Sequence, residues 1–275
     1  MAHVLIPTDL SPNALNAAVY AVHLFGTEGN TFTLLYAYSV PASGVEGDML
    51  GTAAELYKLS EQGLNEFAAR LSDALPDHSP EVSTQCEFGE LTAVLQNVEA
   101  SQPTPAIVVM GTQGSSGLEQ ILLGSNTASA IQHLRTPVLA IPHQAAYQPP
   151  KRIVLADDGG HVDKATVKVL LDIARWSQAE VKIVHVVPEG HPLDEEATTS
   201  GYDAILGAIP HSYHSVSGDN VIVALHDLAE QSDADLVVVV HRHRGLFEQL
   251  FHRSVSKRLA MHTHIPMLVL QQATV

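Results

Sequence analysis

The chain has 275 residues, of which 45% are hydrophobic, so it can form one large or two ordinary domains with a real core. Its formal net charge of −16 argues against binding to nucleic acid or to an anionic membrane surface, because both require clustered Lys and Arg. No apolar run approaches the roughly 18 to 20 residues of a membrane helix.

Two further features favour a cytoplasmic location. The N-terminal residues lack the basic and apolar regions of an export signal. The single cysteine, Cys86, rules out an internal disulfide and fits a reducing compartment. We expect Cys86 to be an ordinary half-buried strand residue rather than a reactive thiol.

Strand-like and helix-like segments alternate along the first half of the chain. Strands such as IVVM and VLAI are continuously apolar, which is typical of a parallel sheet covered by helices on both faces. The first half is therefore predicted to be a doubly wound, Rossmann-like α/β domain with a five-stranded parallel sheet. The predicted strands lie near residues 3–8, 31–38, 82–88, 105–111 and 136–141, and the predicted helices near 12–25, 52–75, 90–101 and 125–134.

The second half repeats this pattern. The segment VLIPTDLSPNALNAAVYAVHL at 4–24 has a counterpart in IVLADDGGHVDKATVKVLLDIA at 153–174. A polar, proline-containing stretch at 143–152 separates the two copies. We therefore predict two tandem domains of the same fold, at 1–145 and 150–275.

The first copy carries about 20 extra residues in its middle, near 42–82. Within them, the segment 43–62 follows the second predicted strand. It is interpreted either as a lid over a pocket or, preferably, as part of an ordinary longer helix.

The stretch GTQGSSGLEQILLGSN follows the fourth predicted strand. Gly111 and Gly114 allow a sharp turn and bring backbone N–H groups close to a ligand. Gly124 and Ser125 then begin a helix, whose free N–H groups, dipole and serine hydroxyl suit a phosphate. The loop contains no Lys or Arg, and it is neither a Walker A loop nor a dinucleotide fingerprint.

This spacing, G-x2-G-x9-G-[ST], resembles that of the ATP-binding members of the universal stress protein family, which also carry an Asp at the end of the first strand, here Asp9. The resemblance covers the whole chain as two copies and implies the adenine nucleotide alpha hydrolase-like fold. It implies ATP or another adenine nucleotide as ligand and leaves Mg²⁺ open. It also implies an intramolecular pseudo-dimer that pairs TPVLAIP (136–142) with IPMLVLQ (265–271), and leaves open whether the chain dimerises again.

The same resemblance assigns roles to individual residues. Asp9 would accept hydrogen bonds from the ribose or the adenine region, with Pro7 and Thr8 lining the base pocket. Ala37 would hold the adenine edge through its backbone, and Met110 would pack on the nucleoside. The residues implied to hold the phosphates and the ribose are Gly111, Gly114, Gly124, Ser125 and Asn126.

Purely structural roles are open for four of these residues. Gly111, taken alone, could be only a turn glycine. Asp9 could cap the first helix, although Ser11 is the better candidate for the cap. Met110 could equally be core filler, and only the alignment points to Ala37.

The second copy departs from the glycine pattern. Val240, His243 and Arg253 stand where the first copy has Gly111, Gly114 and Gly124, and of the motif only Ser254 and Asp158 persist. Large side chains thus replace bare backbone, and we predict a degenerate nucleotide loop.

Histidines in the second copy suggest two other ligands. The segment HRHR (241–244) could bind an anion through side chains, and HTH (262–264) with His252 could suggest a metal. Because no carboxylate or Cys spacing accompanies them, no metal site is predicted.

The sequence contains no nucleophile elbow, no metalloprotease motif and no kinase motifs, and we assign no catalytic residues. The favoured function is a nucleotide-dependent role in stress or signalling, with the first domain as sensor and the second as structural partner. The alternatives are a slow ATPase and an interaction or scaffold module with a vestigial site.

Overall fold

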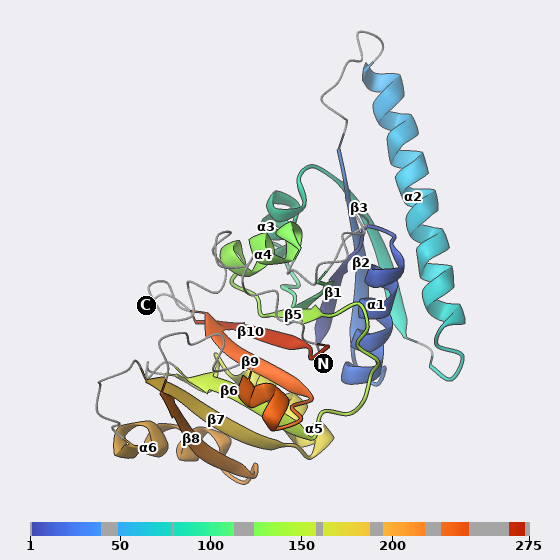
Figure 1. Cartoon of the computed structure of the whole chain (residues 1–275). Helices are drawn as coiled ribbons and strands as arrows, with labels where there is room; N and C mark the ends of the chain where they lie inside the picture. The colour runs from blue at the N-terminus through green and yellow to red at the C-terminus, as the bar shows by residue number, and fades with distance from the viewer. Residues whose placement is uncertain are drawn as a thin grey trace.

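A computed structural model of the chain describes residues 2–39, 49–78, 80–112, 124–157, 162–187, 195–217, 227–241 and 264–272. Strands and helices alternate along both halves (Figure 1). The first half runs β1 (His3–Pro7), α1 (Pro12–Phe25), β2 (Thr31–Tyr38), α2 (Met49–Asp73), β3 (Glu81–Phe88), α3 (Leu91–Ala100), β4 (Ile107–Gly111), α4 (Ser125–His133) and β5 (Val138–Ile141). The second half runs β6 (Arg152–Asp157), α5 (Lys168–Ser177), β7 (Glu180–Val187), α6 (Glu195–Leu206), β8 (His211–Ser217), β9 (Leu236–His241) and β10 (Met267–Gln271).

In the described part of the chain, ten strands form one continuous sheet with the order β3-β2-β1-β4-β5-β10-β9-β6-β7-β8. Every strand pair within a half is parallel. The predicted architecture, two five-stranded parallel sheets in tandem, is therefore confirmed.

The two halves join through their last strands. β5 and β10 pair antiparallel, with Met267 opposite Ala140 and Val269 opposite Val138. The pairing removes one exposed edge from each half. The predicted intramolecular pseudo-dimer is thus formed through the two segments expected from the sequence.

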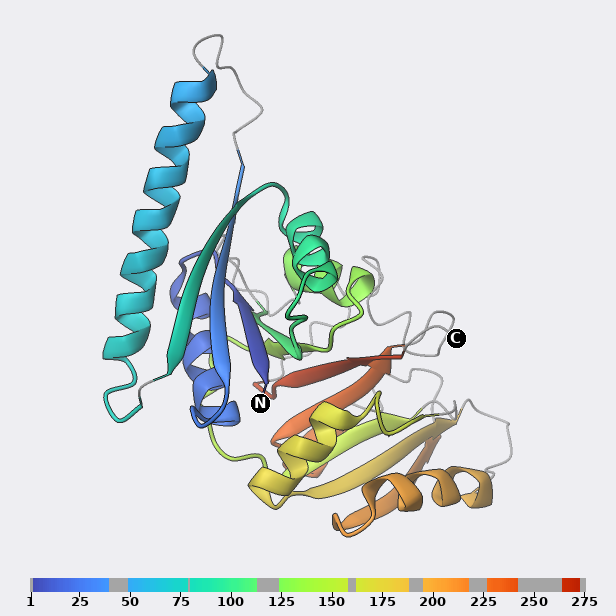
Figure 2. The ribbon, with the colours of Figure 1, turned by 180° about the vertical axis from the view of Figure 1, so that it is seen from behind.

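Helices cover both faces of the first half of the sheet, with α1 and α2 on one face and α3 and α4 on the other (Figures 1 and 2). Successive residues of β1 serve the two faces in turn: Val4 and Ile6 join one buried cluster and Leu5 joins the other. Burial on both faces explains why these strands are apolar at every position.

Local signals in the sequence set the start and end of α1. Ser11 caps the helix, because its hydroxyl accepts a hydrogen bond from Ala14 N at 3.2 Å, and Pro12 occupies the first turn. Gly26, at a φ of 68°, ends the helix with its N–H donated to the carbonyl of Val22.

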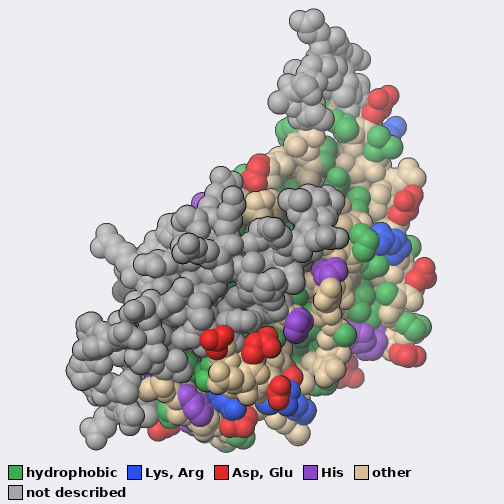
Figure 3. Space-filling model, in the orientation of Figure 1, with side chains coloured by type: hydrophobic (Ala, Val, Ile, Leu, Met, Phe, Trp, Pro, Cys, Tyr) green, Lys and Arg blue, Asp and Glu red, His purple; other side chains and the backbone are tan. Residues whose placement is uncertain are grey.

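The long α2 accounts for most of the extra length of the first copy. It has 25 residues, against 12 in α6, and its first turns extend beyond the sheet (Figures 1 and 2). Leu64, Phe67 and Leu71, at helical spacing, pack into the core, whereas the other side of the helix carries acidic, basic and apolar side chains in alternation (Figure 3). The helix interpretation therefore holds from Met49 onward, while residues 43–48 lie outside the described part.

Despite its length, α2 is not apolar enough to cross a membrane, and neither is any other helix within the described ranges.

Candidate functional site

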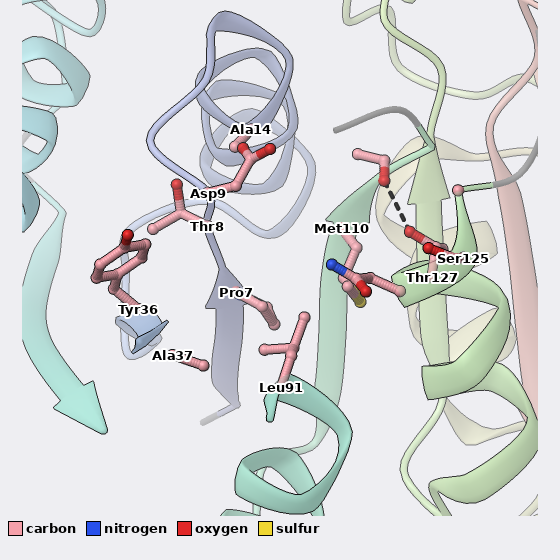
Figure 4. Close-up of a pocket in the computed structure, with 13 residues that line it drawn as sticks. Pro7, Thr8, Asp9, Ala14, Tyr36, Ala37, Leu91, Met110, Ser125 and Thr127 are labelled. Carbon is pink, nitrogen blue, oxygen red and sulfur yellow. Dashed lines mark hydrogen bonds between the residues drawn. The ribbon is translucent and has the colours of Figure 1, made fainter. Parts of the chain in front are cut away.

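A pocket of about 280 Å³ opens at the carboxyl ends of β1 and β4 (Figure 4). The chain passes from β1 to β2 on one side and later returns to β4 on the other side. Such a reversal of strand order leaves a crevice in which ligands of doubly wound folds bind. The pocket is lined by Pro7, Thr8, Asp9, Ala14, Tyr36, Ala37, Leu91, Met110, Gly111, Gly124, Ser125, Asn126 and Thr127.

The structure brings together all the predicted site residues that it describes. They come from the ends of three strands and from the start of α4, and Gly114 alone lies outside the described part. Their roles toward a ligand stay predictions. Four lining residues were missed by sequence reasoning, namely Ala14, Tyr36, Leu91 and Thr127.

The end of β1 forms one wall of the pocket. Thr8 is buried, donates its N–H to the carbonyl of Leu35 at 2.8 Å and accepts the N–H of Leu10 on its hydroxyl at 2.9 Å. Asp9 is exposed, and its Oδ1 accepts the N–H of Ser11 at 3.1 Å. Because Ser11 caps α1, the Asp9 carboxylate is not the helix cap and lies at the pocket instead.

The opposite wall is the start of α4, which two hydrogen bonds connect to the end of β4. The hydroxyl of Thr127 donates to the carbonyl of Gly111 at 2.8 Å, the dashed line in Figure 4, and Gly124 N donates to the carbonyl of Thr112 at 2.5 Å. These bonds hold the first turn of the helix against the end of β4.

The first turn of α4 presents backbone donors to the pocket. Gly124 occupies the cap position and supplies no side-chain hydrogen bond to the helix. The N–H groups of a first helical turn have no partners inside the helix, and together with the helix dipole they attract anions. This end of α4 can therefore accept a phosphate without a basic side chain.

Charge within the pocket is sparse. Among the described residues that line it, Asp9 alone carries a formal charge. An anionic ligand would therefore rely on backbone dipoles, and a ligand hydroxyl would find an acceptor in Asp9.

The corresponding strand ends of the second half carry different chemistry. At the sequence offset of the repeat, Asp157 replaces Thr8 and His185 replaces Tyr36. Asp157 is 2% exposed, and its two oxygens bond to Tyr202 Oη and to His185 Nδ1, both at 3.0 Å. Burial and the neighbouring Asp157 raise the pKa of Tyr202 well above its usual range, so this phenol stays a hydrogen-bond donor.

The predicted degenerate loop is described only at its first position. Val240, which replaces Gly111, is a buried residue of β9. Asp158, His243, Arg253 and Ser254 all lie outside the described residues, so the degeneracy stays a prediction.

Two further expectations from the sequence concern metal ligands and Cys86. Within the described residues, no three His, Cys, Asp or Glu side chains gather as metal ligands would, and His252 and residues 262–263 fall outside that part. Cys86 is half-buried in β3, where burial, followed by the charges of Glu61 and Glu87, raises the pKa of its thiol. A thiol held protonated is a poor nucleophile.

Comparison with known proteins identifies the family. The family model described as "Universal stress protein family" matches residues 1–142 and again 149–271. The chain therefore belongs to the universal stress protein family, a family of nucleotide-binding stress proteins, as a tandem two-domain member.

One relative and one solved structure match the chain over nearly its whole length. A universal stress protein of Mycolicibacterium smegmatis is 23% identical over 284 residues, covering 98% of this chain and 96% of its own length. The crystal structure of a universal stress protein from Archaeoglobus fulgidus DSM 4304 has 18% identity and a TM-score of 0.72, and covers 98% of both chains. At that identity the structural likeness shows the fold alone.

One shorter match is the structure of a protein with a bound ligand. It is a universal stress protein in complex with cAMP, with 20% identity over 51% of this chain and a TM-score of 0.39. That ligand is a property of the other protein.

Proposed function

We propose that this universal stress protein binds one adenine nucleotide, ATP, in the pocket of its first domain, and that the second domain is its structural partner. The observation that supports this most directly is the uncapped start of α4, which faces a crevice at the switch point of the sheet. In this proposal the occupied domain signals nucleotide status in a stress response.

Each wall of the pocket suits a part of the ligand. Pro7, Thr8, Ala37 and Met110 offer a largely apolar site for the base, and Asp9 offers an acceptor for the ribose hydroxyls. Gly111, Gly114, Gly124, Ser125 and Asn126 would hold the phosphates, and four of these five line the pocket. Tyr36 and Leu91 extend the apolar wall.

Mg²⁺ would enter with the nucleotide. Protein sites for Mg²⁺ usually provide one or two carboxylates and leave the other positions to water and phosphate oxygens. Asp9 is the single carboxylate among the described lining residues, so phosphate oxygens and water would supply the other ligands of Mg²⁺.

Stoichiometry tests the assignment to the first domain. Calorimetric titration of nucleotide-free protein with ATP should give one site per chain, and mass spectrometry of freshly purified, denatured protein should detect an adenine nucleotide. Two equivalent sites would refute the asymmetry between the domains, and no binding at all would leave the pocket vestigial.

Turnover separates a binding protein from a slow ATPase. Phosphoryl transfer depends on cations that neutralise the developing charge, and the described lining contains neither Lys nor Arg. Phosphate release by pure protein should therefore be far below the enzyme median of roughly 10 per second. Slow but steady phosphate release would favour the slow ATPase over the binding protein, and a rate near the median would contradict this interpretation of the lining.

A further inference from the structure

The last carbonyls of α4 have no partners inside the helix, and that of Ile131 belongs to a fully buried residue. The last helical bond joins Leu134 N to the carbonyl of Ala130. The next amide, Arg135 N–H, is donated to Glu99 Oε1 at 2.8 Å instead of to Ile131. Ile131 itself is 0% exposed, so its carbonyl depends on a protein donor rather than on bulk water.

The missing donor comes from the other domain. Gln271, the last residue of β10, donates its Nε2 to the carbonyl of Ile131 at 2.8 Å. The Gln271 Oε1 bonds to Nδ1 of His241 at 2.9 Å, and His241 is 6% exposed at the end of β9. Since a carbonyl needs a donor, the amide of Gln271 must turn its nitrogen toward Ile131, and His241 Nδ1–H then donates to the amide oxygen.

This connection runs in one direction only. At the offset of the repeat, Pro142 stands in the place of Gln271 and Thr112 in the place of His241. Proline has no side-chain donor, so the first domain has no equivalent amide to offer to the second. The hydroxyl of Thr112 is buried and has no hydrogen-bond partner among the described residues, whereas His241 is bonded to Gln271.

We propose that Gln271, oriented by His241, is a positioning residue for the phosphate-binding end of α4. The proposal rests on the proposed function, because it assigns the phosphates to the start of that helix. α4 has nine residues and is therefore about 13 Å long, so a tilt or fraying at its C-terminal end changes where Gly124 and Ser125 point. The second domain thereby contributes to a pocket whose described lining comes entirely from the first domain.

Two substitutions remove the donor in different ways. Gln271→Met keeps the length of the side chain and removes both hydrogen bonds. Gln271→Glu keeps an acceptor for His241 but offers no donor to Ile131 when it is ionised. Both variants should bind ATP about five- to tenfold more weakly, because without the donor α4 holds its first turn in the binding position for only part of the time, and the apparent affinity falls by that fraction. Adenosine, which has no phosphates, should bind within about twofold of wild type.

A second glutamine that donates to the same end of α4 provides a matched control. Gln96 on α3 donates to the carbonyl of His133 at 3.4 Å, in an exposed position within the first domain. Gln96→Met removes a donor from the last turn of α4 without touching the other domain. It should change the affinity for either ligand by less than about twofold, because water can replace an exposed donor.

The affinities of the variants for ATP and for adenosine, taken together, test the positioning role of Gln271. An equal loss of ATP and adenosine in the Gln271 variants would mean general damage to the domain and would overturn the positioning role, and so would no loss of either. If wild type binds neither ligand, the proposed function fails, and hydrogen exchange still tests Gln271. Gln271→Met should then speed exchange of the last amides of α4 while Gln96→Met does not, and unchanged exchange would overturn the inference.

Discussion

The ends of the first two strands differ sharply between the two domains, although the sheets that carry them share one topology. In the first domain, β1 is followed by Thr8 and Asp9, which line a pocket together with Tyr36 of β2. In the second domain, β6 ends in Asp157, which is buried and bonded to His185 and Tyr202. The two copies thus share their strands but differ at the strand ends: in one copy polar groups line a pocket, and in the other they bond to one another in the interior.

The largest effect is expected when one residue of the second domain is copied into the pocket of the first. Gly124→Arg introduces the residue found at position 253 into the start of α4. Wild type with ATP at about 100 times its dissociation constant should gain roughly 2.7 kcal/mol of stability. The variant should lose most of this gain, because its side chain fills the space in which backbone N–H groups meet phosphate. Thermal unfolding with and without ATP measures the shift.

The backbone at Gly124 permits the substitution. Its φ of −56° and ψ of 150° are ordinary for any residue, so the melting temperature without ligand should change little. Gly201→Arg in α6, where an added Cβ meets nothing within 4 Å, adds the same charge far from the pocket and should retain the full ATP shift. A full shift in the Gly124 variant would show that α4 does not hold phosphate.

Substitutions at the two corresponding strand ends compare how much stability depends on the buried hydrogen bonds of Asp157 and on the pocket residue Thr8. Asp157→Asn keeps an oxygen for one of the two partners, turns an amide nitrogen toward the other and removes the charge, and should lower the free energy of unfolding by about 2 kcal/mol. Thr8→Val removes one acceptor from the partly exposed Leu10 N–H and should cost less than about 1 kcal/mol. Urea unfolding measures both, and a larger cost at Thr8 would contradict the comparison.

A smaller effect is expected from pH in the first domain. His23 stacks on Tyr147 of the linker and lies edge-on to His78 at 4.7 Å between ring centroids. Burial, and then the charge of His78, lower the pKa of His23 below its usual 6.5. Its contribution to stability is therefore present above pH 6.5 and is lost as the pH falls through the lowered pKa. His23→Gln should therefore reduce the fall in unfolding free energy below pH 6.5, measured by urea unfolding at several pH values.

The second domain contains a histidine whose pKa is raised instead of lowered. The hydrogen bond from His211 Nε2 to Asp203 Oδ1, 2.8 Å long, raises the pKa of His211 above 6.5, helped by the carbonyl of Ile209. This contribution is present below pH 6.5 and is lost as the pH rises through the raised pKa. Because Asp203 is exposed, solvent screens the pair and the effect should be the smallest of those considered. His211→Gln should flatten stability on the alkaline side, and an unchanged profile would contradict the shift.

Much of this architecture could be predicted because the determining signals are local. Ser11, Pro12 and Gly26 delimit α1 within the sequence itself, and continuous apolar runs such as IVVM indicate strands buried on both faces. The glycine spacing from Gly111 to Gly124 indicated a loop and a helix start, and the repeat indicated which strands would pair between the halves.

What could not be predicted depends on contacts between distant segments. Tyr202 is 45 residues from Asp157, and only the packing of α6 on the sheet brings its hydroxyl to that carboxylate. Leu91 lines the pocket because α3 starts beside the end of β1, a placement that no local pattern encodes. The bond from Gln271 to Ile131 spans 140 residues and two domains.

The antiparallel pairing of β5 with β10 has a consequence for how the protein behaves at different expression levels. Two separate copies of such a domain would associate to an extent set by their abundance, and dilution would part them. Here the partner is tethered to the same polypeptide, so the fraction of paired domains does not depend on how many molecules a cell contains. A contact from one domain to the other, such as that between Gln271 and Ile131, is therefore available at the lowest concentrations of protein as fully as at the highest.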